Sequence, residues 1–181
     1  MRAASAISCD DMTAMTTDNA PNNDNDLAPE LSVSQWFNCD QPVTLAGLRS
    51  KVVLIHAFQM LCQGCVMAAT PQAARVWHYY RQNAHRDHVA VIGLHTVFEH
   101  HHVMTPAALQ VYLHEFRVPF PVGVDQPAGD DPIPLTMRAY RMQGTPTTLL
   151  IDRAGRLRKQ HFGVDSDQAL VREIDALLLE N

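Results

Sequence analysis

Two continuous apolar runs of strand length stand out in the pattern of hydrophobic and polar positions. The first is KVVLIHAF at 51–58 and the second is HVAVIGL at 88–94. Runs of this length without polar alternation are typical of central strands that are buried on both faces. Between them, from Gln63 to about Asn83, apolar residues recur every three or four positions, which predicts a helix kinked at Pro71. The order strand, helix, strand predicts a parallel pair with a right-handed crossover.

The flanking segments complete the pattern of an α/β domain. The expected elements are an edge hairpin over 31–43, a helix over 105–117 that opens with Thr105-Pro106, an extended piece over 119–124, one or two helical turns over 135–142, antiparallel strands over 147–152 and 157–162, and an amphipathic helix over 165–179. We therefore expect one domain over 30–181. It would hold a central mixed sheet flanked by helices, with an N-terminal hairpin extension and an insertion after the second core strand.

Residues 1–29 are mostly Asn, Asp, Thr and Ala and are predicted to form a disordered tail. The tail lacks the apolar core of a secretory signal, and no segment approaches the length of about 18 apolar residues that a membrane span needs. The chain as written therefore predicts a cytoplasmic protein, or a periplasmic one if the start is mis-assigned. The net charge of −5 offers no electrostatic reason to expect nucleic acid or a membrane as partner.

The cysteines carry the main chemical signal. There are four, Cys9, Cys39, Cys62 and Cys65, which is too few for a disulfide scaffold. Cys62 and Cys65 form a C-x-x-C pair where a strand passes into a helix, and the free N–H groups and dipole of a helix N-terminus stabilise a thiolate there. Cys62 is then the expected nucleophile and Cys65 the resolving thiol, while Gly64 keeps the turn open to a bulky partner. A metal site and a pair of core cysteines remain alternatives.

A second motif, Gly144-Thr145-Pro146-Thr147, directly precedes the strand at 147–152. Together with C-Q-G-C, the apolar strands and Gly93-Leu94-His95-Thr96, it resembles the TlpA-like thioredoxin family and more closely the redoxin (AhpC/TSA-related) branch. The resemblance covers about 31–180 and implies a thioredoxin-like fold and a thiol-disulfide oxidoreductase without a cofactor. It also implies that Pro146 is cis and packs against the active disulfide, and that the Thr145 backbone pairs with an incoming substrate.

The sequence departs from that family near the cysteines. Leu61 replaces the usual Trp, Gln63 replaces a common Pro, and His56 stands six residues before Cys62, where thioredoxin has a buried Asp. His56 could move a proton to or from Cys65, because imidazole titrates near neutral pH. The alternative is a strand histidine that is hydrogen-bonded within the core.

Five further residues, His95, Glu99, His100, His101 and His102, follow the second apolar strand. This is the sheet edge where α/β proteins place ligands, and imidazole with thiolate suits zinc or copper. Three consecutive histidines cannot all face one ion, so a solvated loop is the competing interpretation.

Three functions follow from these observations. The leading one is a thiol-disulfide oxidoreductase that reduces a protein or small-molecule disulfide and is itself recharged by an unidentified thiol donor, since the cytoplasm keeps thiols reduced. The second is a peroxiredoxin-like peroxidase, although Ile55 and Gln59 stand where the P-x-x-x-T-x-x-C pattern needs Pro and Thr. The third is a metal-binding module that uses cysteine and histidine.

Overall fold

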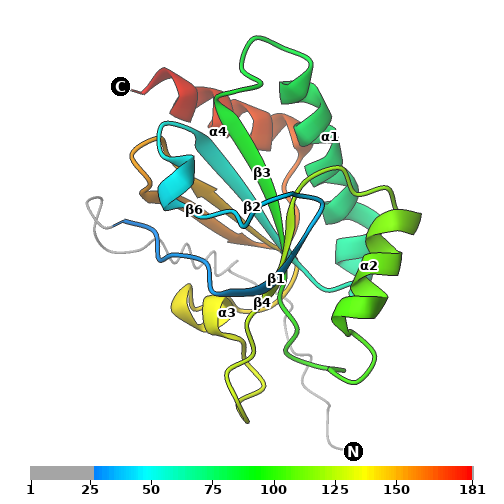
Figure 1. Ribbon diagram of the computed structural model, residues 1–181. Helices are drawn as coiled ribbons and strands as arrows, with labels where there is room; N and C mark the ends of the chain where they lie inside the picture. Colours follow the sequence, from blue (N-terminus) through cyan, green and yellow to red (C-terminus); the bar gives the residue numbers. More distant parts are fainter. Residues whose placement is uncertain (1–26, 181) are drawn as a thin grey trace, which may run out of the picture.

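The structure is a computed structural model that describes residues 27–180 (Figure 1). Residues 1–26 of the predicted tail, with Cys9, lie outside the described residues. Residues 27–29 belong to the domain instead, because Leu27 bridges to Arg156 and the Ala28 N–H donates to the Gly155 carbonyl at 2.9 Å. The domain therefore begins at least three residues before the boundary expected from composition.

One six-stranded mixed sheet organises the chain, in the order β1-β4-β3-β2-β5-β6. The elements are β1 (Val33–Phe37), η1 (Ala46–Leu48), β2 (Val52–Phe58), η2 (Cys65–Ala69), α1 (Thr70–Arg81), β3 (Val89–His95), α2 (Pro106–Glu115), β4 (Val122–Asp125), α3 (Leu135–Ala139), β5 (Thr147–Ile151), β6 (Leu157–Phe162) and α4 (Asp167–Leu179). The two apolar runs are the central parallel strands β2 and β3, as predicted. Strands β5 and β6 pair antiparallel, as predicted, and the structure places β5 antiparallel beside β2.

The edge hairpin expected over 31–43 is absent. That segment supplies the single strand β1, which pairs antiparallel with β4, the extended piece expected over 119–124. Asn38 turns the chain away from the sheet with a φ of 59°, and its side-chain amide donates to the carbonyls of Val118 and Phe120. Alternation predicted a strand here correctly, but it carries no information on a partner some 90 residues away.

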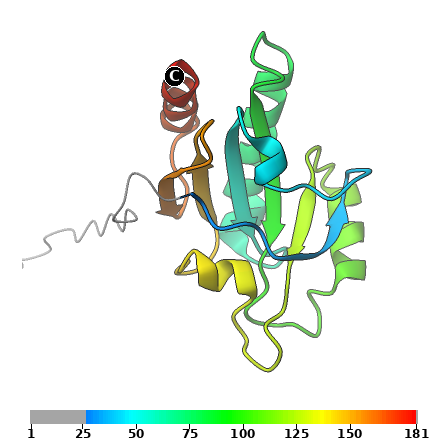
Figure 2. The same ribbon diagram turned by 60° about the vertical axis from the view of Figure 1, so that its left-hand side comes forward.

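Side chains alternate across β2 and build one core on each face of the sheet. Leu54, His56 and Phe58 face the layer of α1, α2 and α4, whereas Val53, Ile55 and Ala57 face α3, η1 and the N-terminal segment. Figure 2 shows these two layers on opposite sides of the strands. Because β2 is covered on both faces, every one of its residues is buried.

Helix ends follow the expected capping chemistry. Thr105 caps α2 by accepting from the Ala108 N–H at 3.3 Å, with Pro106 as the first helical residue. Ser166 caps α4 in the same way by accepting from the Ala169 N–H at 3.2 Å. No helix among the described residues is both long and apolar enough to cross a membrane.

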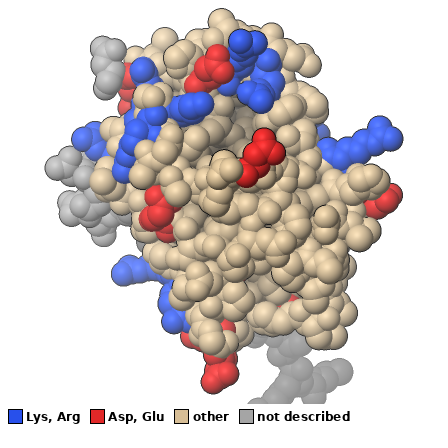
Figure 3. Space-filling view, viewed as in Figure 1, with Lys and Arg blue, Asp and Glu red and all other residues tan. Residues whose placement is uncertain are grey.

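The surface has no broad field of one sign on the face seen in Figure 1. Basic and acidic side chains are interspersed in its upper part, while the middle and the lower right carry few charges (Figure 3).

Candidate active site

Cys62 and Cys65 lie where the end of β2 leads into a helical turn. Cys62 occupies the position before that turn and is half-buried, while Cys65 is fully buried. The Cys65 backbone N–H donates to Cys62 Sγ at 3.2 Å, so the sulfur accepts a hydrogen bond from a free helix N–H in the way a capping side chain does. The Cys65 thiol lies 2.6 Å from Cys62 Sγ. The structure therefore brings the two predicted thiols into direct contact at a helix N-terminus.

The G-T-P-T turn meets this pair from β5. The Thr145–Pro146 bond is cis, as the resemblance implied, and the Cys62 thiol lies 3.5 Å from the Thr145 carbonyl oxygen. Pro146 packs against Gly64 between the two cysteines, since a Cβ on Gly64 would stand 3.4 Å from Pro146 Cδ. Cys62, Cys65, Gly64, Thr145 and Pro146 thus form one continuous site.

Burial makes the Cys65 thiol a weaker acid than an ordinary cysteine thiol. Desolvation, followed by contact with Cys62, raises the pKa of Cys65 to about 12. A thiol of this kind stays protonated until a neighbouring group takes its proton or stabilises its thiolate.

The helix after Cys65 begins with a π turn, η2, ahead of the α-helical segment α1. Pro71 has no N–H to donate, and the Thr70 N–H donates to the carbonyl of Cys65, five residues back. In a regular α-helix, positions five apart lie about 140° apart around the axis. The wider π turn brings them closer to one side, and Cys65 and Thr70 are both buried, at 0% and 5% exposed. Where the sequence predicted a kink at Pro71, the structure has this π turn directly before the α-helix.

His56 of β2 contacts the residue that follows the π turn, Thr70. Its Nε2 lies 2.9 Å from the Thr70 hydroxyl oxygen, and its ring stacks on Phe58 at 5.2 Å between centroids. Burial lowers the pKa of His56 to about 3, so the ring is neutral. The core-histidine interpretation is therefore right about the burial and the hydrogen bond, and the proton-transfer role stays a prediction.

Two more polar side chains lie next to the Phe58 ring: His95, which the sequence analysis named as a candidate ligand at this sheet edge, and Tyr112, which it did not mark. His95, at the end of β3, is fully buried 5.4 Å from that ring, and burial lowers its pKa to about 4. Tyr112 of α2 lies 6.0 Å from the same ring. Among the described residues, the buried side-chain N and O atoms without a hydrogen-bond partner are both ring nitrogens of His95 and the Tyr112 hydroxyl.

The other candidate ligands do not join this site. His100, His101 and His102 are exposed in the loop after β3, where His101 Nε2 lies 3.3 Å from the Pro132 carbonyl. Within residues 27–180 no three His, Cys, Asp or Glu side chains are placed to hold a metal ion together. Cys39 is half-buried next to Asp40, and both burial and that carboxylate raise its pKa.

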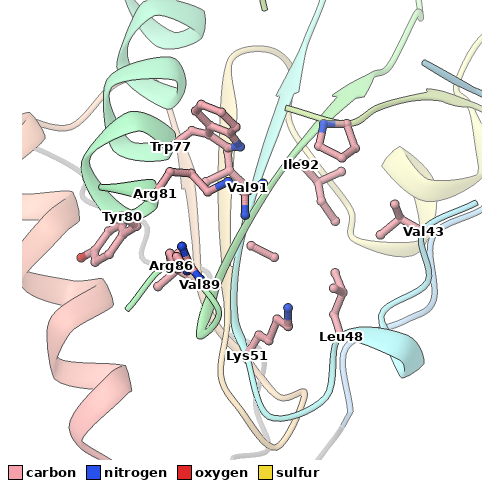
Figure 4. Close-up of a pocket in the computed structure, with 12 residues that line it drawn as sticks. Val43, Leu48, Lys51, Trp77, Tyr80, Arg81, Arg86, Val89, Val91 and Ile92 are labelled. Carbon is pink, nitrogen blue, oxygen red and sulfur yellow. The ribbon is translucent and has the colours of Figure 1, made fainter. Parts of the chain in front are cut away.

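A hollow of about 180 Å³ lies at the opposite end of β3 from the dithiol. Trp77 and Arg81 of α1 approach the first half of β3 there, beside Val91 (Figure 4). Neither Cys62 nor Cys65 is among the described residues that line this hollow, so it is separate from the candidate active site.

Comparison with known proteins agrees with this geometry. A solved structure described as a thioredoxin-like superfamily protein, SPOA0173, is 57% identical, with a TM-score of 0.80 over 86% of this chain and 97% of that one. A thiol-disulfide isomerase from Corynebacterium glutamicum is 46% identical, with a TM-score of 0.78 over 85% of this chain and 98% of that one.

Two curated relatives match more distantly. They are Protein DipZ of Mycobacterium bovis and of Mycobacterium tuberculosis, each 28% identical over 153 residues. The match covers 81% of this chain, which spans about a fifth (20%) of the length of these relatives. A scan against protein-family models found no match. The mixed sheet, the C-x-x-C pair at a helix N-terminus and the extensive identity to SPOA0173 together show that this chain belongs to the thioredoxin-like superfamily.

Proposed function

We propose that this protein is a thiol-disulfide oxidoreductase that reduces disulfides, with Cys62 as nucleophile and Cys65 as resolving thiol. The observation that carries the proposal is the position of Cys62 Sγ, which accepts the Cys65 N–H at 3.2 Å and lies 2.6 Å from the Cys65 thiol. The Cys62 sulfur is thus hydrogen-bonded at a helix N-terminus. It also contacts the Cys65 thiol, which must displace the substrate from it.

The reaction would run in two exchanges. The Cys62 thiolate attacks a sulfur of the substrate disulfide, a mixed disulfide forms, and the other substrate sulfur leaves as a thiolate. Cys65 then loses its proton and attacks Cys62 Sγ, which releases the second substrate sulfur and leaves a Cys62–Cys65 disulfide. Two electrons pass from the dithiol to the substrate, the two protons end on its thiols, and a separate thiol donor restores the dithiol.

The burial of Cys65 supports the reducing direction. Strongly oxidising members of this chemistry stabilise their reduced form as thiolate. Here desolvation raises the pKa of Cys65 to about 12, so this sulfur gives the reduced form no such thiolate stabilisation.

The surroundings of Cys62 suit a polypeptide or another bulky disulfide. Leu61 and Met67 flank the pair in sequence and are 61% and 74% exposed, so they offer apolar contacts to a bound chain. We propose that the backbone at Thr145 pairs with that chain. Because Gly64 has no side chain beside Pro146, the edge of the site stays open to the bound chain. The name of the isomerase from Corynebacterium glutamicum supports a disulfide substrate of this kind.

His56 is our proposed proton acceptor for Cys65. Its neutral ring can accept a proton, and it reaches the helix of Cys65 through the Thr70 hydroxyl. With a pKa of about 3, the buried His56 ring is a weak base. A thiolate forming in the same buried space would raise that pKa, because its negative charge attracts the protonated ring. The transfer is therefore expected only together with the attack of Cys65.

Equilibration with glutathione of graded redox potential tests the proposal. We expect a reversible two-electron transition on the peptide that holds Cys62 and Cys65, read by alkylation and mass, with a midpoint nearer roughly −270 mV than −120 mV. Cys65→Ser should instead accumulate a mixed disulfide at Cys62, whereas the matched control Cys39→Ser should behave as the wild type. A pair that stayed reduced at every glutathione ratio would contradict the assignment, and a midpoint near −120 mV would reverse its direction.

A further inference from the structure

The first half of β3 has an open edge. Strand β3 pairs with β2 along its whole length, but with β4 only over its last three residues. The N–H groups of successive strand residues point to opposite sides, and the Gly93 N–H donates toward β4, to the Pro121 carbonyl at 2.9 Å. The N–H and C=O groups of Val89 and Val91 therefore point to the same side. No group among residues 27–180 is hydrogen-bonded to them there.

Two prolines explain why the pairing of β3 with β4 stops where it does. If the register continued backwards, the N–H groups of residues 121 and 119 would donate to the carbonyls of Val91 and Val89, respectively. Both donors are missing, because Pro121 and Pro119 have no N–H. Strand β4 therefore begins at residue 122, and the place beside the first half of β3 is left without a strand.

The hollow at this end of β3 occupies the place of the missing strand. Trp77 and Arg81 of α1 stand on one side of β3 (Figure 4). Val43 and Leu48, from the segment around η1, stand on the other side. Residues 89–92 of β3 lie between these two walls. A hollow that follows a strand edge between two covering layers has the form of a slot for one more strand.

The charged side chains that line this slot are all basic. They are Lys51, Arg81 and Arg86, and no acidic residue of the described chain lines it. Arg81 is held beside the slot by Trp77, with its guanidinium carbon 5.3 Å from the ring centroid. Arg86 pairs with Asp87 at 3.3 Å, but the two side chains are 67% and 73% exposed, so this pair is weak and easily exchanged. The slot therefore favours a segment with negative charge.

The two walls differ, and the difference selects the occupant. We call Arg81 and Arg86 the basic wall and Val43 and Leu48 the apolar wall. Side chains of an added strand alternate between the two walls, so a segment with acidic and apolar residues in turn suits both. A second copy of this chain suits them less well, because pairing of two β3 edges would bring two sets of basic side chains together.

We propose that the open edge of β3 is a docking site for an extended segment of a partner protein in which acidic and apolar residues alternate. The backbone of that segment pairs with the free N–H and C=O groups of Val89 and Val91. Its acidic side chains face the basic wall and its apolar side chains lie against the apolar wall. The dithiol lies at the other end of β3, so a docked partner leaves Cys62 open to a substrate.

A peptide titration tests the docking site. Reduced, isotope-labelled full-length protein is mixed with the synthetic peptide acetyl-VEVEVE-amide, and the backbone amides are followed by NMR. In the free protein the amides of Val89 and Val91 should exchange with deuterium faster than those of Ala90 and Ile92, which point to β2. The peptide should shift the Val89 and Val91 signals downfield and slow their exchange. The matched control acetyl-VKVKVK-amide should bind about tenfold more weakly, because its charge is opposite.

Charge reversal tests the basic wall. Arg81→Glu should weaken the binding of acetyl-VEVEVE-amide about fivefold, because attraction of a factor of up to about five at an exposed ion pair is replaced by repulsion. Adding Arg86→Glu should weaken it further and make acetyl-VKVKVK-amide the tighter ligand. Arg172→Glu makes the same change of charge on the exposed face of α4, outside the slot, and should leave binding unchanged.

Three results would overturn the proposal. The first is no binding at about 1 mM peptide, the weak end of measurable affinity. The second is equal binding of the two peptides, or binding that charge reversal does not change. The third is slow exchange of Val89 and Val91 in the free protein, which means that the edge is already covered. Another part of the chain covers it if the protection persists on dilution, and a second copy covers it if dilution removes the protection. The proposed dithiol reaction stands in each case, since none of its steps uses this edge.

Discussion

Acid should weaken this fold through two histidines that it holds uncharged in the interior. His56 and His95 are 2% and 0% exposed. Burial lowers their pKa values to about 3 and about 4, respectively. In the unfolded chain both return to about 6.5. Below that pH the unfolded chain therefore binds protons that the folded protein excludes, and the free energy of unfolding falls with pH.

The size of the effect follows from the two shifts. The stabilising contribution is fully present above about pH 6.5 and is lost as the pH falls toward the folded-state values. In that window each histidine removes about 1.4 kcal/mol per pH unit. At pH 5 the loss is about 2 kcal/mol for each histidine and about 4 kcal/mol for both, a large part of the roughly 5–15 kcal/mol that ordinary domains possess.

One buried carboxyl acts in the opposite sense. Burial raises the pKa of Asp125 despite hydrogen bonds from the backbone of Thr136, the hydroxyl of Thr96 and the backbone of Met137. Its protonation favours the folded state at low pH and offsets part of the loss at the acid end of the window. The steepest decline is therefore expected about one pH unit below 6.5, where the unfolded histidines are mostly protonated and the folded ones are not.

Urea unfolding at pH 7, 6 and 5, followed by tryptophan fluorescence with the dithiol kept reduced, measures the slope. His95→Leu removes two ring nitrogens that have no partner among the described residues, so it should halve the slope and exceed wild-type stability at pH 5. The exposed His102→Gln is the control and should keep the full slope. A wild-type free energy of unfolding that is unchanged between pH 7 and 5, or a full slope in His95→Leu, would refute the reasoning.

Two further substitutions test the packing and the hydrogen bonding behind the site. Gly93→Ala should lower the free energy of unfolding by about 1–3 kcal/mol, because a Cβ there would stand 2.9 Å from a Val122 methyl and 3.1 Å from the Phe120 ring. An unchanged melting temperature would show that β4 yields easily. Thr70→Val should cost about 1–3 kcal/mol by leaving His56 Nε2 unpaired, whereas Thr70→Ser should retain most of the stability. Equal stability of the two variants in urea unfolding would mean that the hydroxyl is not needed.

Local patterns identified much of this protein without its structure. The unbroken apolar runs predicted the buried strands β2 and β3, and the expected cap Thr105 stands at the observed start of α2. The C-x-x-C pair was assigned to a helix N-terminus because strand and helix periodicities meet at Cys62. Such features depend on neighbours within about one helical turn or on strand length, and the order of residues contains them.

Partners that are distant in sequence could not be predicted in this way. The segment over 31–43 carries a strand pattern, but only the completed sheet decides that β1 pairs with β4 rather than with a neighbouring segment. The same holds for Tyr112, whose position at three- and four-residue spacing is that of any core residue of α2. Its contact with the Phe58 ring of β2 exists only once α2 has packed against the sheet.

The sequence by itself determined the chemical identity of this protein, namely a dithiol at a strand-to-helix junction and a proline turn to accompany it. The tertiary structure decided the environment in which that chemistry operates. It buried Cys65, neutralised His56, set Thr70 against His56 through a π turn, and set Tyr112 against Phe58 through the packing of α2. The physical reason is that desolvation and electrostatic coupling depend on which atoms surround a group in space, and most of those atoms come from residues that are remote along the chain.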